Sequence, residues 1–263
     1  MAVVISKDGT RIGFDRQGQG PPLLLVDGAM CYRDSGPMKP LAALLAPHFT
    51  VFTYDRRGRG ESGDTQPWSL EREVEDIAAL VREAGEPVYL YGISSGAVLA
   101  LEAADRGVPI RKLALYEAPL MVDDSRPPLG EDFLPRMKQL IAQNRRGDAV
   151  KMFMKAVGVP AIGILVMRLM PAWKKLTAIG HTLQYDLGFT HPYQQGRSLP
   201  AGIWSGATMP SLVMDGGKSP AWMRNAQAAI AGVLPRATAR TLPGQNHMVG
   251  AKAMAPELIE FFA

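Results

Sequence analysis

A serine between two glycines is the clearest candidate for chemistry in this sequence. Ser94 lies in Gly92-Ile93-Ser94-Ser95-Gly96, directly after an apolar run and directly before a helical pattern of small residues. Serine at a sharp strand-to-helix turn of this spacing can act as a nucleophile, and the glycines let strand and helix approach closely. The N-terminus of the helix favours negative charge at the same point. The pattern predicts that Ser94 attacks a carbonyl carbon.

A serine hydroxyl is a weak nucleophile and needs a general base. The sequence has four histidines that could serve. His48 precedes an early strand, and His181 and His191 lie in a region that reads as helical. Only His247 lies in a loop after the last expected strand, behind a tight Pro-Gly turn. Because serine followed late in the chain by histidine is the order of one known arrangement of this chemistry, we expect His247 to be the base.

Two kinds of pattern alternate along the chain and must position these side chains. Strands are expected at 2–6, 10–16, 23–26, 50–54, 88–91, 112–116, 211–214 and 238–242, and helices follow most of them. One helix is expected to begin after Ser69, which is a suitable N-cap. Strands alternating with helices predict an α/β fold with a mostly parallel, doubly wound sheet, and Asp8-Gly9 predicts an antiparallel hairpin at its start.

The alternation stops between residues 120 and 199, where helices broken by proline and glycine are expected. We therefore expect a core formed by residues 1–119 and 200–263 and a helical cap formed by residues 120–199. Such an insertion covers the carboxyl ends of the strands, where doubly wound sheets bind ligands. The most apolar stretch, 157–170, is expected to be a buried or pocket-lining helix.

Composition narrows the class of protein further. Hydrophobic residues make up 47% of the 263 residues, which is enough for a sizeable core. The net charge of +4 is spread along the chain and has no basic cluster interleaved with aromatics, so no nucleic-acid partner is expected. No run of about 18 apolar residues and no signal-peptide pattern is present, so no membrane partner is expected. A lone cysteine, Cys31, predicts a reducing, cytoplasmic location.

Five segments, in this order, resemble the α/β-hydrolase superfamily over nearly the whole chain. They are the strand 23–26 with its following glycine, the arginine- and glycine-rich turn 54–62, the Ser94 turn, the strand 211–214 with its glycines, and the loop 243–247. The resemblance implies the α/β-hydrolase fold, with Ser94 as nucleophile and His247 as base. It also implies an oxyanion hole formed by the backbone N–H groups of Ala29 and Ser95.

Two positions depart from the pattern of that superfamily. Asp27 stands where histidine is usual before Gly28, and Ser219 stands where the third member of the catalytic triad, an acid, is usual. Glu117 ends the strand after the Ser94 unit, where some members of the superfamily place this acid. Fungal hydrolases that open a macrocyclic resorcylic lactone are similar in this respect. Glu117 is the favoured acid, and the alternatives are Asp215, Asp123 and Asp124.

Residues just after the expected oxyanion-hole residue Ala29 and residues in the expected cap supply an adaptable apolar surface for a hydrophobic substrate. The expected substrate-binding residues are Met30, Tyr32, Met121, Met154, Trp173 and His181. No cluster of histidine, cysteine and carboxylate has the spacing of a metal site, and no glycine-rich nucleotide loop follows a strand, so neither a metal nor a cofactor is expected.

These residues predict an enzyme that hydrolyses a small hydrophobic carboxylic ester or lactone through an acyl-enzyme. The same triad could instead cleave a carbon–carbon bond or a thioester. A ligand-binding protein that keeps the triad but turns over slowly, as hormone receptors resembling this superfamily do, is a third possibility. The nucleophile is serine and not aspartate, which disfavours dehalogenase and epoxide-hydrolase chemistry. The sequence does not indicate an oligomeric state.

Overall fold

One eight-stranded sheet organises the chain, with strands in the order β1-β2-β4-β3-β5-β6-β7-β8. The computed structural model describes residues 2–263. The strands are β1 (Ala2–Ile5), β2 (Arg11–Gln17), β3 (Pro22–Val26), β4 (Thr50–Tyr54), β5 (Val88–Ile93), β6 (Ile110–Tyr116), β7 (Ser211–Gly216) and β8 (Ala237–Leu242). β2 is antiparallel to β1 and β4, and all other neighbouring strands are parallel. The predicted α/β class with a mostly parallel sheet is confirmed.

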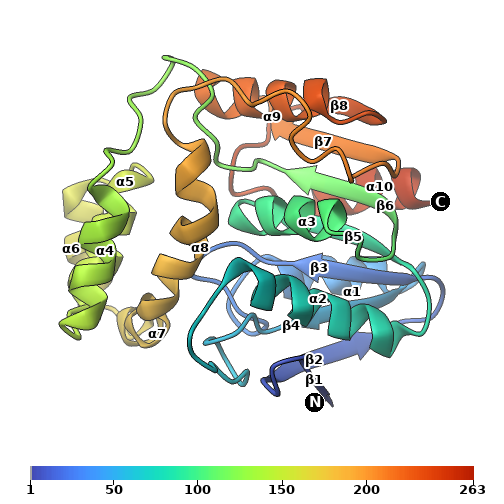
Figure 1. Cartoon of the computed structure of the whole chain (residues 1–263), viewed down its shortest axis with the longest axis horizontal. Coiled ribbons are helices and arrows are strands. Elements are labelled where there is room, and N and C mark those ends of the chain that lie inside the picture. Colours follow the sequence, from blue (N-terminus) through green and yellow to red (C-terminus); the bar gives the residue numbers. More distant parts are fainter. Residues whose placement is uncertain (1) are drawn as a thin grey trace.

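Helices cover both faces of the sheet, as the alternation predicts (Figure 1). On the face toward the viewer of Figure 1 lie α2 (Leu70–Ala84), α3 (Ser95–Asp105) and α9 (Ala221–Val233), and behind the sheet lie α1 (Met38–Leu45) and α10 (Ala251–Phe262). Each face therefore has its own hydrophobic cluster.

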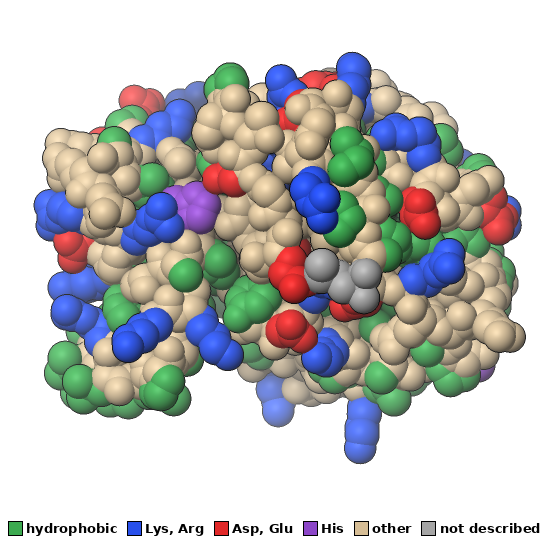
Figure 2. Space-filling model, turned by 90° about the horizontal axis from the view of Figure 1, so that it is seen from below, with side chains coloured by type: hydrophobic (Ala, Val, Ile, Leu, Met, Phe, Trp, Pro, Cys, Tyr) green, Lys and Arg blue, Asp and Glu red, His purple; other side chains and the backbone are tan. Residues whose placement is uncertain are grey.

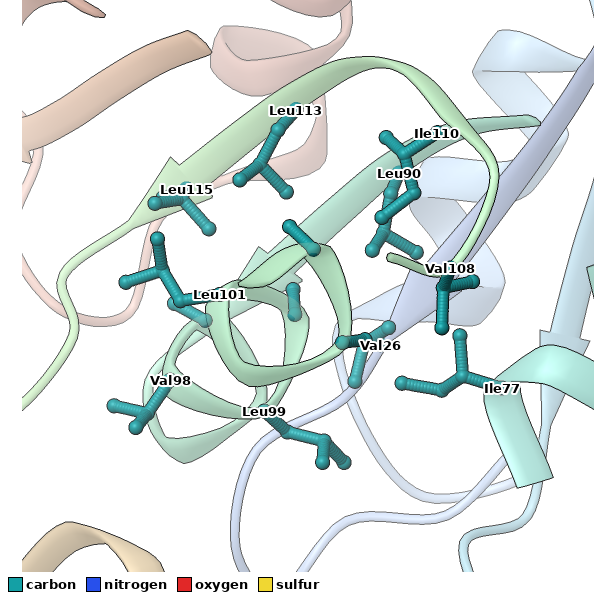
Figure 3. Close-up of a cluster of buried hydrophobic side chains, with 14 of the residues drawn as sticks. Val26, Ile77, Leu90, Val98, Leu99, Leu101, Val108, Ile110, Leu113 and Leu115 are labelled. Carbon is teal, nitrogen blue, oxygen red and sulfur yellow. The ribbon is translucent and has the colours of Figure 1, made fainter. Parts of the chain in front are cut away.

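α3 lies at the centre of the larger cluster, and Figure 3 shows why this helix is rich in small and branched apolar residues. Val98, Leu99 and Leu101 are fully buried against side chains of the sheet such as Leu90 and Leu115. The strand residues alternate across the sheet, so that one set meets α3 and the other meets α1 and α10.

α2 begins where the sequence predicts. The side chain of Ser69 accepts a hydrogen bond from the backbone N–H of Arg72 at 3.3 Å, which satisfies one of the free donors at the start of the helix. At the other end Gly85 adopts a φ of 77°, a left-handed conformation that glycine takes without strain.

The described residues between β6 and β7 form helices and no strand. They are α4 (Phe133–Ala142), α5 (Arg146–Ala156), α6 (Ala161–Leu169), α7 (Ala172–Ala178), α8 (Leu183–Thr190) and two short 3-10 helices, η1 (Gly180–Thr182) and η2 (His191–Tyr193). In Figure 1 these helices lie beyond the arrowheads of β6 and β7, at the carboxyl ends of the strands.

The expectation that the apolar stretch 157–170 forms a buried or pocket-lining helix is wrong for α6. Of its residues only Ile164 is buried, whereas Ile162 is 68% and Leu169 83% exposed. α6 packs against α5 and α7 at the outer edge of the helical segment, so only one side of it finds a neighbour. Within the part of the chain that the structure describes, no helix is long and apolar enough to cross a membrane.

Candidate active site

Ser94 occupies a sharp turn between β5 and α3. Its φ of 56° lies in the left-handed region, which a non-glycine residue adopts only where the surroundings enforce it. The backbone N–H of Ser94 donates to the carbonyl oxygen of Tyr116 at 2.9 Å, which ties the turn to β6. A side chain at Gly92 or Gly96 would collide with neighbouring backbone atoms, so both positions of the motif require glycine.

His247 and Glu117 are hydrogen-bonded to each other. His247 Nδ1 lies 2.9 Å from Glu117 Oε2, and the Glu117 side chain is completely buried. The other carboxylate oxygen, Oε1, accepts from the backbone N–H of Gly216 at 2.8 Å and from the hydroxyl of Ser219. Tyr116 donates its hydroxyl to the carbonyl oxygen of Asn246 at 2.7 Å and so anchors the loop before His247. These contacts fix the ring of His247 in one orientation.

The other three candidate acids lie elsewhere. Asp123 is bound to Ser125 and Asn225 at the surface, and Asp124 is exposed. Asp215 is at the end of β7, where burial raises the pKa of its carboxyl and no hydrogen bond joins it to His247 among the described residues. Of the four candidates, the structure brings only Glu117 to His247.

Ala29 and Ser95, the expected oxyanion-hole residues, line the same cavity as Ser94 and His247. Gly28 lies so close to Ser94 that a Cβ on it would be 3.0 Å from the Cβ of Ser94. Before it, the buried Asp27 accepts the Gly28 N–H at 2.8 Å through Oδ1. Burial raises the pKa of Asp27 to about 7. The Asp27-Gly28 turn beside Ser94 therefore contains a buried carboxyl group whose pKa lies near neutral pH.

A buried carboxylate on α8 joins the helical segment to the sheet. Asp186 accepts hydrogen bonds from Arg56 Nη1 at 2.6 Å, from Ser95 Oγ at 2.7 Å and from Arg59. Arg59 also donates to the carbonyl oxygen of Gly28 at 2.7 Å. Burial alone would raise the pKa of Asp186, but the charges of Arg56 and Arg59 outweigh it and hold this pKa below its usual value.

The cavity around Ser94 has a volume of about 210 Å³ and a mostly apolar wall. Met121, Phe133 and Phe153 come from the helical segment and its entry, and Trp222 comes from the start of α9. Substrate pockets usually have volumes of about 300–1,000 Å³, so this one suits a small ligand.

Of the six residues expected to bind substrate, Met121 lines the cavity and the other five do not. Met30 is buried in the core of the helical segment, with Tyr32, Met154 and Trp173 packed against it. His181 lies 3.3 Å from Asp64 instead. Met30, Tyr32, Met154 and Trp173 therefore belong to the hydrophobic packing of the helical segment and not to the wall of the cavity.

Several cavity residues were not expected from the sequence, among them Arg126, Gln194, Phe153 and Trp222. Arg126 lies in a loop, Gln194 directly follows η2, and Phe153 and Trp222 lie on helices, so distant parts of the chain set their packing. No local pattern marks them. Among residues 2–263, no group of three histidine, cysteine or acidic side chains is placed to hold a metal ion.

The sheet order, the turn at Ser94 and the His247–Glu117 pair define the class of protein. A family model described as "Alpha/beta hydrolase family" matches residues 23–256, and the chain belongs to this family. A solved alpha/beta hydrolase from Sphaerobacter thermophilus DSM 20745 is 47% identical, covers 100% of each chain and superposes with a TM-score of 0.90.

Two curated relatives match shorter stretches. An uncharacterised hydrolase of Bacillus subtilis (strain 168) is 28% identical over 151 residues, which are 55% of this chain and 54% of that protein. A pimeloyl-[acyl-carrier protein] methyl ester esterase of Xanthomonas oryzae pv. oryzae is 36% identical over 106 residues, 40% of each chain. This chain thus spans about half or less of the length of these relatives.

Proposed function

We propose that this protein is a serine hydrolase that cleaves a carboxylic ester or lactone with Ser94, His247 and Glu117 as its triad. The observation that carries the proposal is the 2.9 Å hydrogen bond between His247 Nδ1 and the buried Glu117, in a cavity that Ser94 also lines. A carboxylate at Nδ1 selects the tautomer whose Nε2 is free to take a proton.

Each group then has a defined step in acyl transfer. Ser94 Oγ attacks the carbonyl carbon while His247 Nε2 takes its proton, and the N–H groups of Ala29 and Ser95 stabilise the oxyanion. His247 next gives this proton to the leaving alcohol. Water, activated by the same imidazole, attacks the acyl-enzyme and releases the acid. No hydrogen bond joins Ser94 to His247 in the described residues, and such bonds often tighten only when substrate binds.

The cavity between the helical segment and Ser94 supports the proposal that the substrate is a small ester. We propose that residues 120–199 form a cap over a core of residues 1–119 and 200–263, because Met121, Phe133 and Phe153 close the cavity above Ser94. Hydrolysis of a methyl ester by a relative that is 36% identical over part of the chain supports the same reaction class. The single cysteine supports a reducing compartment such as the cytoplasm.

A substrate panel tests this proposal. Purified protein and Ser94→Ala are given p-nitrophenyl acetate and butyrate, aliphatic lactones, a thioester and a vinylogous 1,5-diketone, which reports carbon–carbon cleavage. We expect turnover of esters or lactones that disappears in Ser94→Ala. Turnover of the thioester or diketone alone would reassign the reaction. Binding of these compounds without turnover would favour the slow, receptor-like alternative.

A further inference from the structure

The cavity wall contains one cation that no carboxylate neutralises. Arg126 lies in the loop before α4 and lines the cavity together with Ser94 and His247. Its Nη2 donates to the carbonyl oxygen of Ala156, and its guanidinium lies 4.4 Å from the centroid of the Trp222 ring. Within residues 2–263 no acidic side chain forms an ion pair with Arg126, and burial lowers its pKa with no charge to offset this effect.

The acidic side chain that lines this cavity, Asp186, already forms ion pairs with other arginines. The carboxylate of Asp186 accepts hydrogen bonds from Arg56, Arg59 and Ser95, and its side chain is buried among them. It therefore does not neutralise Arg126. An arginine stays protonated in proteins, so the cavity keeps a positive charge next to an apolar wall.

A second cavity residue also lacks a partner. Gln194 is 6% exposed, and its Nε2 donates to the carbonyl oxygen of Pro119 at 2.8 Å. Its Oε1 is buried and accepts no hydrogen bond from the described residues. Buried polar atoms are normally paired, so this unpaired acceptor is a candidate partner for a hydrogen-bond donor on the ligand. This observation is independent of the charge on Arg126.

We propose that the substrate is a carboxylate-bearing ester, such as a half ester of a dicarboxylic acid, whose free carboxylate binds Arg126. A hydroxyl or N–H group on its chain donates to Gln194. This inference rests on the proposed ester hydrolase function and adds the substrate class to it.

The geometry of Arg126 suits this role. Stacking on Trp222 holds the guanidinium plane in place, and a single N–H is used by Ala156, so other N–H groups remain for a carboxylate. Arginine binds carboxylates through two parallel hydrogen bonds, and these are stronger where water is excluded. The apolar wall contributed by Met121, Phe133 and Phe153 would contact the methylene chain between the ester and the acid.

A matched pair of substrates tests the proposal in the wild-type protein. Monomethyl adipate and methyl hexanoate have the same chain length and differ in the terminal carboxylate. We expect kcat/KM for the half ester to exceed that for the neutral ester by about tenfold to a hundredfold, mainly through KM, as is typical of a charge-assisted hydrogen bond. Equal kcat/KM values for the two esters would overturn the inference and leave the ester hydrolase proposal intact.

Variants then locate the effect. Arg126→Gln should raise KM for monomethyl adipate by about tenfold or more and change methyl hexanoate hydrolysis by less than about threefold, and Arg126→Lys should retain part of the preference. Arg136→Gln, on α4 with an ion pair that is mostly exposed, is the matched control and should keep the wild-type preference. Equal losses on both esters in Arg126→Gln would make Arg126 a structural residue only.

A further substrate tests whether Gln194 accepts a hydrogen bond from the ligand. Monomethyl 3-hydroxyadipate offers a hydroxyl that the unsubstituted half ester lacks. In the wild-type protein it should bind more tightly than monomethyl adipate, and Gln194→Met should abolish the difference. The same ratio in Gln194→Met and wild type would remove Gln194 from the substrate site. Failure of every ester, including p-nitrophenyl acetate, would instead contradict the proposed function itself.

Discussion

Glu117 is the residue on which the proposed chemistry depends most. Its carboxylate is completely buried, and one oxygen is satisfied by Gly216 and Ser219 while the other faces His247. A charge can stay buried when its hydrogen bonds are complete, as they are here. Ser219, at the position where the superfamily usually has its acid, thus donates a hydrogen bond to a carboxylate at the end of the neighbouring strand.

Glu117→Gln should reduce kcat for ester hydrolysis by about 10³- to 10⁴-fold, because the amide no longer selects the active tautomer or stabilises the imidazolium of His247. Asp215→Asn, at the end of the adjacent strand, is the matched control and should stay within about threefold of wild type. Steady-state kinetics on p-nitrophenyl butyrate measures both. A large loss in Asp215→Asn with near-normal Glu117→Gln would reverse the assignment.

The raised pKa of the buried Asp27 predicts that its contribution to the free energy of unfolding depends on pH. Burial raises its folded pKa from 3.8 to about 7, so the folded state binds more protons than the unfolded state between these values. The contribution of Asp27 to the free energy of unfolding therefore falls as the pH rises from about 4 to 7, by at most about 1.4 kcal/mol per pH unit. Asp27→Asn removes this dependence.

Urea unfolding of wild type and Asp27→Asn at several pH values between 4 and 8 checks this expectation. The variant should gain stability relative to wild type toward pH 8 and lose the gain toward pH 4. Asp34→Asn, whose carboxylate is exposed beside Lys39, is a control with little change. A constant difference between Asp27→Asn and wild type across this range would show that the Asp27 carboxyl is ionised throughout.

Some residues of the candidate site could be predicted from the sequence, and others could not. The contact between His247 and Glu117 and the place of His247 beside Ser94 in one cavity were predictable, because each of the three residues follows a strand at a position set by short, recognisable spacing; their catalytic roles stay a proposal. The places of Arg126 and Gln194 in the cavity were not predictable, since they depend on contacts with distant residues, Trp222 for Arg126 and Pro119 for Gln194. For the same reason Met30 and Trp173 were assigned to the cavity but lie in the packing beneath it.

Among the elements, α8 makes the strongest connection between the helical segment and the sheet. It carries Asp186, which binds Arg56 and Arg59 from the turn after β4 and Ser95 from the start of α3. All four side chains are buried. The contacts therefore tie α8 to the turn after β4 and to the residue that follows Ser94.

Removal of this carboxylate should be costly. Asp186→Ala leaves the buried Arg59 without its carboxylate partner and leaves Arg56 with Glu73 alone, and breaking a buried ion pair in this way typically costs about 3–5 kcal/mol of unfolding free energy. Asp148→Ala, which removes an exposed carboxylate from α5, should cost less than about 1 kcal/mol. Chemical denaturation compares the two. Equal and small effects would mean that α8 is held by its apolar contacts alone.

Most strands and the helices between them were predictable because they have runs of apolar residues with the period of their structure, whereas residues 120–199 were predicted only as helical and without the bounds of single helices. The exposure of α6 was not predictable, since an apolar run does not reveal whether a neighbour exists to cover it. Ile162 and Leu169 are residue types typical of a hydrophobic core, but both side chains are exposed to solvent.

At the scale of the whole molecule, the largest hydrophobic cluster includes α3 and one face of the sheet, and the surface has charges of both signs. Figure 2 shows Lys and Arg side chains spread over one face, with acidic side chains between them. This distribution agrees with a modest net charge of +4. We expect side chains in the hydrophobic cluster around α3, which Figure 3 shows, to contribute most to the free energy of unfolding.

A pair of leucine substitutions tests where the stability lies. Leu101→Ala opens a cavity in the α3 cluster, where the side chain is 0% exposed, and should cost about 2–5 kcal/mol of unfolding free energy. Leu169→Ala removes the same atoms from α6, where the side chain is 83% exposed, and should change stability by less than about 0.5 kcal/mol. Thermal and urea unfolding give both values. Similar losses would show that α6 is covered in solution.

The central claim is that Ser94 is the nucleophile of an acyl-transfer site, and covalent labelling tests it most directly. The wild-type protein is treated with a fluorophosphonate, and the modified peptide is identified by mass spectrometry. We predict one adduct per chain, on Ser94, with parallel loss of esterase activity and no adduct in Ser94→Ala. No adduct in a folded wild-type protein, or an adduct on a different serine, would contradict the claim.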